Sequence, residues 1–181
     1  MLRLNIPATE FFDESTEEFH TTRATAIQLE HSLVSLAKWE AEWEKPFLNS
    51  TDKTADESLD YIRCMTITQN VDPGVYDLIS RMPNLVQQIT DYINRPMTAT
   101  TIKERPNGGG QRIMTAELLY YDMFALNIPM ECQKWHLNRL IMLIRVCAIE
   151  SNPKKKMGRR DIASYNQALN QARRQKFHTK G

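Results

Sequence analysis

The stretch 115–150 constrains the fold most, because it is rich in apolar residues and is interrupted by a single proline, Pro129. Residues just before a proline are pushed away from helical backbone angles, so a first helix should end near Asn127. Pro129 suits the first turn of a second helix, where its missing N–H costs nothing. The stretch therefore predicts two helices, the second over about 129–150.

The second of these helices has apolar positions that recur at the spacing of one buried face. They are Leu137, Leu140, Ile141, Ile144 and Ala148. Leu143, Val146 and Cys147 widen that face well beyond a narrow stripe. A helix that is apolar around most of its girth must be enclosed by other elements. We therefore predict a mainly α protein, a helical domain built around a buried central helix at about 129–150.

The N-terminal residues alternate in a way that is typical of a half-buried strand, with Leu2, Leu4 and Ile6 on one face. A β-prone run follows at 18–29, where Ile27 and Leu29 share a face. We expect a small β-hairpin over 1–30 that packs on the helices.

The region 31–152 should form the helical core. Ser32 can cap a helix over about 32–44, and Thr54 with Glu57 forms a capping-box pattern that opens a helix to about residue 68. Further helices are predicted at 75–81 and 84–94, and a short strand at 98–102. Trp39 and Trp43 lie four residues apart, and we interpret them as core anchors and not as a ligand site.

The last segment, 153–181, reads as a basic linker followed by a basic amphipathic helix over about 159–176. Its apolar stripe is thin, with Ile162, Tyr165, Leu169 and Ala172. Such a helix is marginal alone, so it should dock on the core or on a partner, or remain partly mobile. The candidate partner-binding residues are Lys154, Lys155, Lys156, Arg159, Arg160, Ile162, Tyr165, Leu169, Arg173 and Arg174.

Charge is unevenly spread along the 181 residues, although the net charge is only +1. Segment 1–60 has 13 acidic and 5 basic residues, whereas segment 154–181 has 1 acidic and 9 basic residues. The two ends can attract each other only at close range, because salt at about 0.15 M screens beyond about 8 Å. Two separately solvated faces are an equally good interpretation.

Several classes of protein lack support in the sequence. No apolar run approaches the roughly 18 residues of a membrane span. The N-terminus also lacks the apolar region of a signal peptide. We therefore expect a cytoplasmic protein that does not bind or cross a membrane. The three cysteines, Cys64, Cys132 and Cys147, are an odd number and widely spaced, which favours reduced and mostly buried thiols.

No pattern supports catalysis or a cofactor. A nucleophile elbow, a zinc-protease motif and a kinase signature are all missing from the sequence, so we predict that the chain is not an enzyme. Cys132 and His136 lie four apart on one predicted helix, but zinc normally takes four ligands. A buried thiol and an imidazole at a polar rim are the expected roles, with no metal and no cofactor.

The basic end could bind phosphates electrostatically, which leaves a nucleic-acid-binding protein as an alternative. Few aromatic residues are interleaved there to stack on bases, so this alternative has the weakest support.

Several runs of the sequence together carry a family resemblance. In the second half they are YY at 120–121, ALNIP at 125–129, ECQKWHLNRL at 131–140, LIRVC at 143–147, PKKKM at 153–157 and NQALNQARR at 166–174. In the first half they are QLEHSLVS at 28–35 and DYIRCMT at 60–66. Through these runs, most of the chain resembles the tail assembly chaperones of tailed bacteriophages.

The resemblance implies a function. Copies of the protein would coat the tape-measure protein, a long helical chain, in the host cytoplasm, and would present it to the tail-tube protein. Self-association into a homo-oligomer would be compatible with this role. The alternative is a structural component of the virion, in the tail, baseplate or connector.

Overall fold

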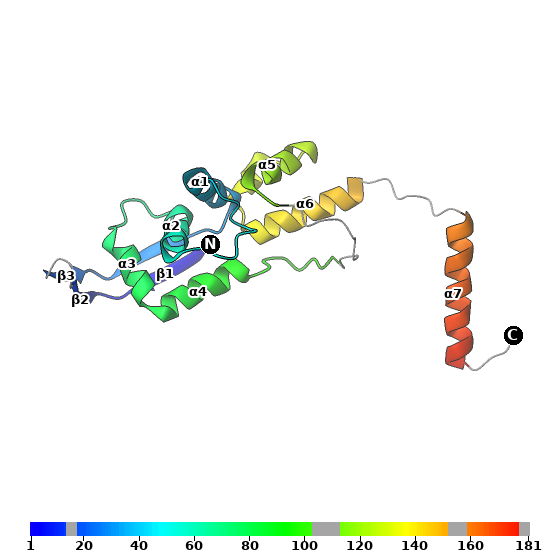
Figure 1. Ribbon diagram of the computed structural model, residues 1–181, viewed down its shortest axis with the longest axis horizontal. Coiled ribbons are helices and arrows are strands. Elements are labelled where there is room, and N and C mark those ends of the chain that lie inside the picture. Colours follow the sequence, from blue (N-terminus) through cyan, green and yellow to red (C-terminus); the bar gives the residue numbers. More distant parts are fainter. Residues whose placement is uncertain (14–17, 103–112, 152–158, 178–181) are drawn as a thin grey trace. The chain divides into compact units, whose positions relative to one another are not determined.

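The computed structural model is mainly helical, with a small antiparallel β element at its N-terminus (Figure 1). It describes residues 1–13, 18–102, 113–151 and 159–177, but not the side chains of 11–13, 18–22 and 159–162 or of residues 165, 172, 175 and 177. The strands are β1 (Leu2–Ile6), β2 (Thr9–Asp13), β3 (Glu18–Thr22) and β4 (Thr25–Leu29). The helices are α1 (Leu33–Trp43), α2 (Ala55–Met65), α3 (Gly74–Arg81), α4 (Pro83–Asn94), α5 (Ala116–Ala125), the 3-10 helix η1 (Met130–Lys134), α6 (Leu137–Ser151) and α7 (Arg159–Phe177).

The chain divides into two compact units, Met1–Ile149 and Glu150–Gly181. The first unit holds the strands and the helices from α1 to most of α6, and the second holds α7.

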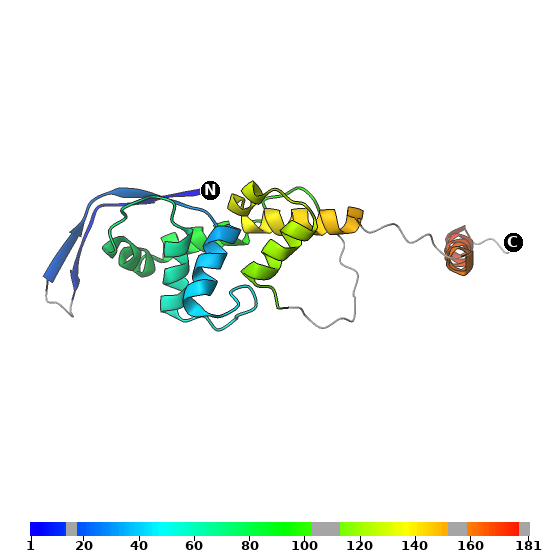
Figure 2. The same ribbon diagram turned by 90° about the horizontal axis from the view of Figure 1, so that it is seen from above.

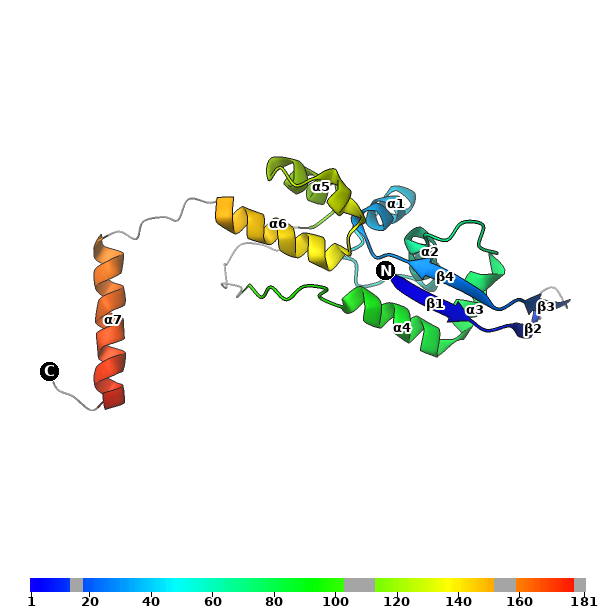
Figure 3. The ribbon, with the colours of Figure 1, turned by 180° about the vertical axis from the view of Figure 1, so that it is seen from behind.

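The predicted N-terminal β element is confirmed. β1 pairs with β4 in antiparallel register, with Leu4 opposite Ile27 and Leu2 opposite Leu29. Leu4, Ile6, Ile27 and Leu29 are buried, because alternate side chains of both strands face the helices. β1 contacts α4 directly, and Figure 3 shows the ladder beside that helix. β2 and β3 form a second antiparallel pair, which extends away from the helices of this unit (Figure 2).

Two of the helix starts follow from the capping residues that the sequence predicts. The Ser32 side chain accepts a hydrogen bond from the Ser35 N–H and begins α1. Thr54 and Glu57 exchange hydrogen bonds as a capping box at the start of α2. α1 ends where Glu44 adopts a left-handed conformation, just before Pro46.

Two predicted elements differ from the structure. Residues 98–102 form a loop with a bend at residue 99 and no strand. The helix expected at about 129–150 begins only at Leu137. Met130–Lys134 form the 3-10 helix η1, and Trp135 is extended. The physical reason lies at His136, which forms an isolated β-bridge with Ser32 and therefore leaves the helical conformation.

The first unit contains two hydrophobic clusters, and α1 contributes to both. Trp39 belongs to a cluster with the β1–β4 ladder, α2, α3 and α4. Leu33 and Leu36 belong to a cluster with α5, η1 and α6. α6 adds Leu137, Leu140 and Ile144 to the second cluster, while its Leu143 is only partly buried. The α6 side chains are therefore covered mainly on one face, not around most of the girth as predicted.

Candidate functional site

The predicted partner-binding residues differ in how far the structure describes them. Three lie outside the described residues: Lys154, Lys155 and Lys156. Four lie in α7, but their side chains lie outside the description: Arg159, Arg160, Ile162 and Tyr165. Three have described side chains, and of these Leu169 is partly exposed, whereas Arg173 and Arg174 are exposed.

α7 combines an apolar line with a strong positive charge. Positions 162, 165, 169 and 172 are separated by three, four and three residues, so the helix brings them to one face. The helix has five Arg or Lys residues and one acidic residue, Asp161. A cationic helix with a narrow apolar face is suited to binding the surface of another protein.

A second exposed surface lies on α5, and we call Glu117, Tyr121 and Phe124 the α5 strip. These residues are four and three apart, so they share one helix face. Tyr121 is 63% exposed and Phe124 is 65% exposed. The opposite face of α5 is buried, through Ala116, Leu119 and Met123. Two largely exposed aromatic side chains on one face are typical of a protein-binding surface.

Glu40 is a buried carboxylate that joins two parts of the chain. Its Oε1 accepts a hydrogen bond from the Phe47 N–H at 2.8 Å, and its Oε2 accepts one from the Ala116 N–H at 2.6 Å. Burial raises the pKa of Glu40, and these two hydrogen bonds oppose the rise. The second bond satisfies the N-terminus of α5, where the described atoms of Thr115 make no side-chain capping bond. The carboxylate therefore has a structural role.

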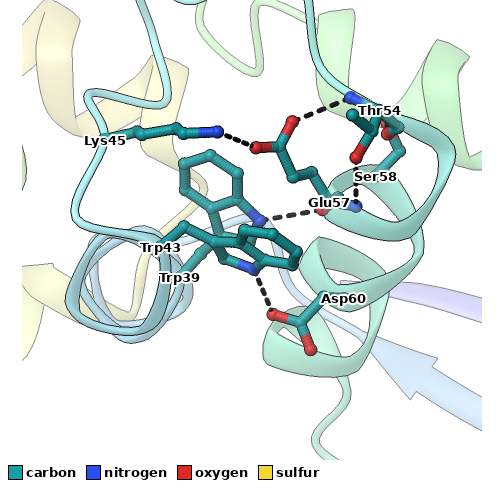
Figure 4. A network of polar contacts seen from close by, with 7 residues as sticks. All are labelled: Trp39, Trp43, Lys45, Thr54, Glu57, Ser58 and Asp60. Carbon is teal, nitrogen blue, oxygen red and sulfur yellow. Dashed lines mark hydrogen bonds and ion pairs between the residues drawn. The ribbon is translucent and has the colours of Figure 1, made fainter.

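Glu57 lies at the centre of a second polar network (Figure 4). Its carboxylate accepts hydrogen bonds from Lys45 Nζ and from the Thr54 N–H. The hydrogen bond from Lys45 is the main reason that the pKa of Glu57 is lowered. Trp39 Nε1 donates to the Glu57 carbonyl oxygen at 2.8 Å, and Trp43 Nε1 donates to Asp60 at 2.9 Å. Trp39 is fully buried, as expected of a core anchor.

The structure brings together two histidines that the sequence does not connect. His31 and His136 are 2% and 4% exposed, and their ring centroids lie 5.1 Å apart. The prediction that His136 lies at a polar rim is wrong, because the β-bridge to Ser32 draws it inward. His31 Nδ1 is hydrogen-bonded to the Tyr61 hydroxyl at 2.6 Å, and His136 Nε2 donates to the Tyr92 carbonyl at 3.0 Å.

Burial keeps both imidazoles neutral near pH 7. It lowers the pKa of His31 to about 3, with a further contribution from His136, and it also lowers the pKa of His136. His136 Nδ1 is buried and makes no hydrogen bond to the described residues. No sequence signal links the two histidines, because they lie 105 positions apart and meet only through tertiary pairing.

Cys132 and His136 are the remaining pair of residues whose side chains could bind a metal ion. Cys132 is buried as a free thiol, as expected, whereas the free thiols of Cys64 and Cys147 are only partly buried. In the described part of the chain, no group of three or more His, Cys, Asp or Glu residues is arranged to hold a metal ion.

The exposed surfaces on α7 and α5 are therefore the candidate sites, and both are suited to binding protein. Comparison of the chain with known protein families, curated proteins and solved structures found no match. Among the described helices, none is long and apolar enough to cross a membrane.

Proposed function

We propose that the chain is a non-enzymatic assembly factor that binds a helical protein, as a tail assembly chaperone of a tailed phage would. The observation that carries the proposal is α7, a basic helix in a compact unit of its own with an apolar line along one face. The sequence resemblance described above supplies the partners, a tape-measure protein and, through it, the tail-tube protein.

The mechanism requires binding and no reaction chemistry. Apolar positions of a tape-measure helix would lie against Leu169 and its neighbours on the stripe, which would protect them from aggregation. Arg173 and Arg174 would pair with acidic side chains beside that stripe. We propose three domains in chain order, namely a hairpin (1–30), a helical core (31–152) that includes α6, and a binding segment (153–181). The place of action would be the host cytoplasm.

Co-expression with the tape-measure protein, followed by pull-down, tests the proposal. Leu169→Asp should abolish capture, because it places a charge on the apolar line. Gln167→Asp is the matched control, because it adds the same charge to an exposed position off that line. Equal capture by both variants would contradict the proposal.

A structural virion component is the alternative, and the composition of purified virions separates the two functions. Peptide mass fingerprints should lack this chain if it is a chaperone, and should contain it if it is a tail, baseplate or connector subunit.

A nucleic-acid-binding protein has the least support and a distinct signature. Its affinity would fall steeply with salt, and neutralising Lys154, Lys155, Lys156, Arg159 and Arg160 would remove that dependence.

A further inference from the structure

α5 has apolar side chains on every side, yet the described residues of its unit cover it only in part. Its only charged residues are Glu117 and Asp122. A helix with this composition is normally enclosed. Ala116, Leu119 and Met123 are buried in the second hydrophobic cluster, whereas Tyr121 and Phe124 are largely exposed. Tyr121 and Phe124 of the α5 strip therefore form an exposed apolar surface of the kind that binds another protein.

The charged residues near the α5 strip are mainly acidic, which favours a partner with positive charge. Segment 113–133 has three acidic residues, Glu117, Asp122 and Glu131, and no Lys or Arg. Glu117 and Glu44 also line a shallow hollow of about 240 Å³ at the N-terminal end of α5, together with Lys45, whose charge is paired with Glu57. The aromatic faces of Tyr121 and Phe124 attract cations as well. The suitable partner is a cationic helix with a narrow apolar face.

The chain itself contains a helix with this chemistry. α7 has a net charge of +4, from five basic residues and Asp161. Leu169 and Arg173 are four residues apart on α7, as are Tyr121 and Glu117 on α5. An antiparallel pair of helices can therefore place Leu169 against Tyr121 and Arg173 against Glu117 at the same time.

We propose that the α5 strip of one copy binds α7 of a second copy, so that copies associate head to tail. Such a contact joins two different surfaces, so a pair of copies keeps one free α5 strip and one free α7. The contact is small, so the association should be weak and should depend on concentration. It goes beyond the proposed function and requires no phage partner.

Sedimentation velocity of the full chain over a concentration series tests the proposal. The weight-average mass should rise with concentration for the unaltered chain. Tyr121→Ser combined with Phe124→Ser should keep the mass at that of a monomer, and so should Leu169→Asp. Ile67→Ser is the matched control, because Ile67 is a large apolar residue that is 51% exposed elsewhere, and it should associate like the unaltered chain. Circular dichroism should show that all variants keep their helix content.

Mixing two defective variants identifies the occupant of the strip. The Tyr121→Ser/Phe124→Ser variant keeps an intact α7, and the Leu169→Asp variant keeps an intact α5 strip. Each should be monomeric alone, and the mixture should contain dimers with twice the monomer mass and no larger species. A monomer for the unaltered chain at every concentration, or no dimer in the mixture, would overturn the proposal. So would association through any surface that the two variants leave intact.

A charge reversal tests the expected register. Glu117→Arg should weaken association at least tenfold, and adding Arg173→Glu to the same chain should restore most of it. Glu42→Arg, on the exposed side of α1, is the control and should have no effect. A failure of these variants would refute self-association without bearing on tape-measure capture, because no phage protein is present.

Discussion

At the scale of single residues, Glu40 stabilises the first unit, because its two carboxylate oxygens accept hydrogen bonds from the backbone N–H groups of Phe47 and Ala116. Glu40→Ala would leave both donors without this partner. The free energy of unfolding should fall by about 1–3 kcal/mol, which urea denaturation can measure. Glu42→Ala is the control on the same helix, and it should change stability by less than about 0.5 kcal/mol, because Glu42 is exposed. Equal losses of unfolding free energy in the two variants would show that the hydrogen bonds of Glu40 are not the cause.

His31 should make stability depend on pH in a defined direction. Its pKa is about 3 in the folded protein, against 6.5 for an unperturbed histidine, so between these values the unfolded chain binds more protons. Stability attributable to His31 is therefore fully present above about pH 6.5 and is lost as the pH falls. The loss from pH 6.5 to pH 5 should be about 2 kcal/mol. His136 acts in the same direction, because burial also lowers its pKa.

Urea midpoints measured from pH 7.5 to pH 4.5 check this prediction. His31→Gln should flatten the profile below pH 6.5, while a glutamine can still hydrogen-bond to Tyr61. Glu40 acts in the opposite direction, because its raised pKa lets the folded protein take up a proton first as the pH falls. Glu40 is present in both the unaltered chain and the His31→Gln variant. The difference between their two pH profiles therefore does not contain the contribution of Glu40. Profiles of equal slope would refute the role of His31.

At the scale of elements, α6 should contribute strongly to stability through one face. Leu140 is fully buried in the second cluster, so Leu140→Ala should cost about 2–5 kcal/mol in thermal or urea unfolding. Ile144→Ala should fall in the same range. Leu143→Ala should cost clearly less, because Leu143 is only partly buried. A loss below about 0.5 kcal/mol for Leu140→Ala would show that α6 is misplaced.

The comparison of elements shows what the sequence can and cannot predict. The starts of α1 and α2 were predictable, because Ser32 and Thr54 act on neighbours within three residues. The start of α6 was not, because it depends on a bridge between His136 and Ser32, which are distant in the sequence. The α5 strip was also not predictable, since apolar side chains on every side of α5 leave no periodicity that would mark its exposed face.

At the scale of the whole molecule, the division after Ile149 predicts that the first unit folds without the second. Deleting 154–181 should leave cooperative unfolding and the near-ultraviolet signal of the tryptophans unchanged. Under the proposed function, the same deletion should weaken capture of the tape-measure protein. A truncated chain that is unfolded would show that the terminal segment is part of the core. The proposed function rests on the sequence resemblance, because the residues themselves form no catalytic pattern.

α1 connects the two hydrophobic clusters, through Trp39 on one side and Leu33 with Leu36 on the other. Neither cluster can open fully while this helix stays packed, so the two should lose their structure in one step. The backbone amides of α1 should then exchange with deuterium only when the entire first unit unfolds. Those of β2 and β3, which form a separate two-stranded pair, should exchange orders of magnitude sooner.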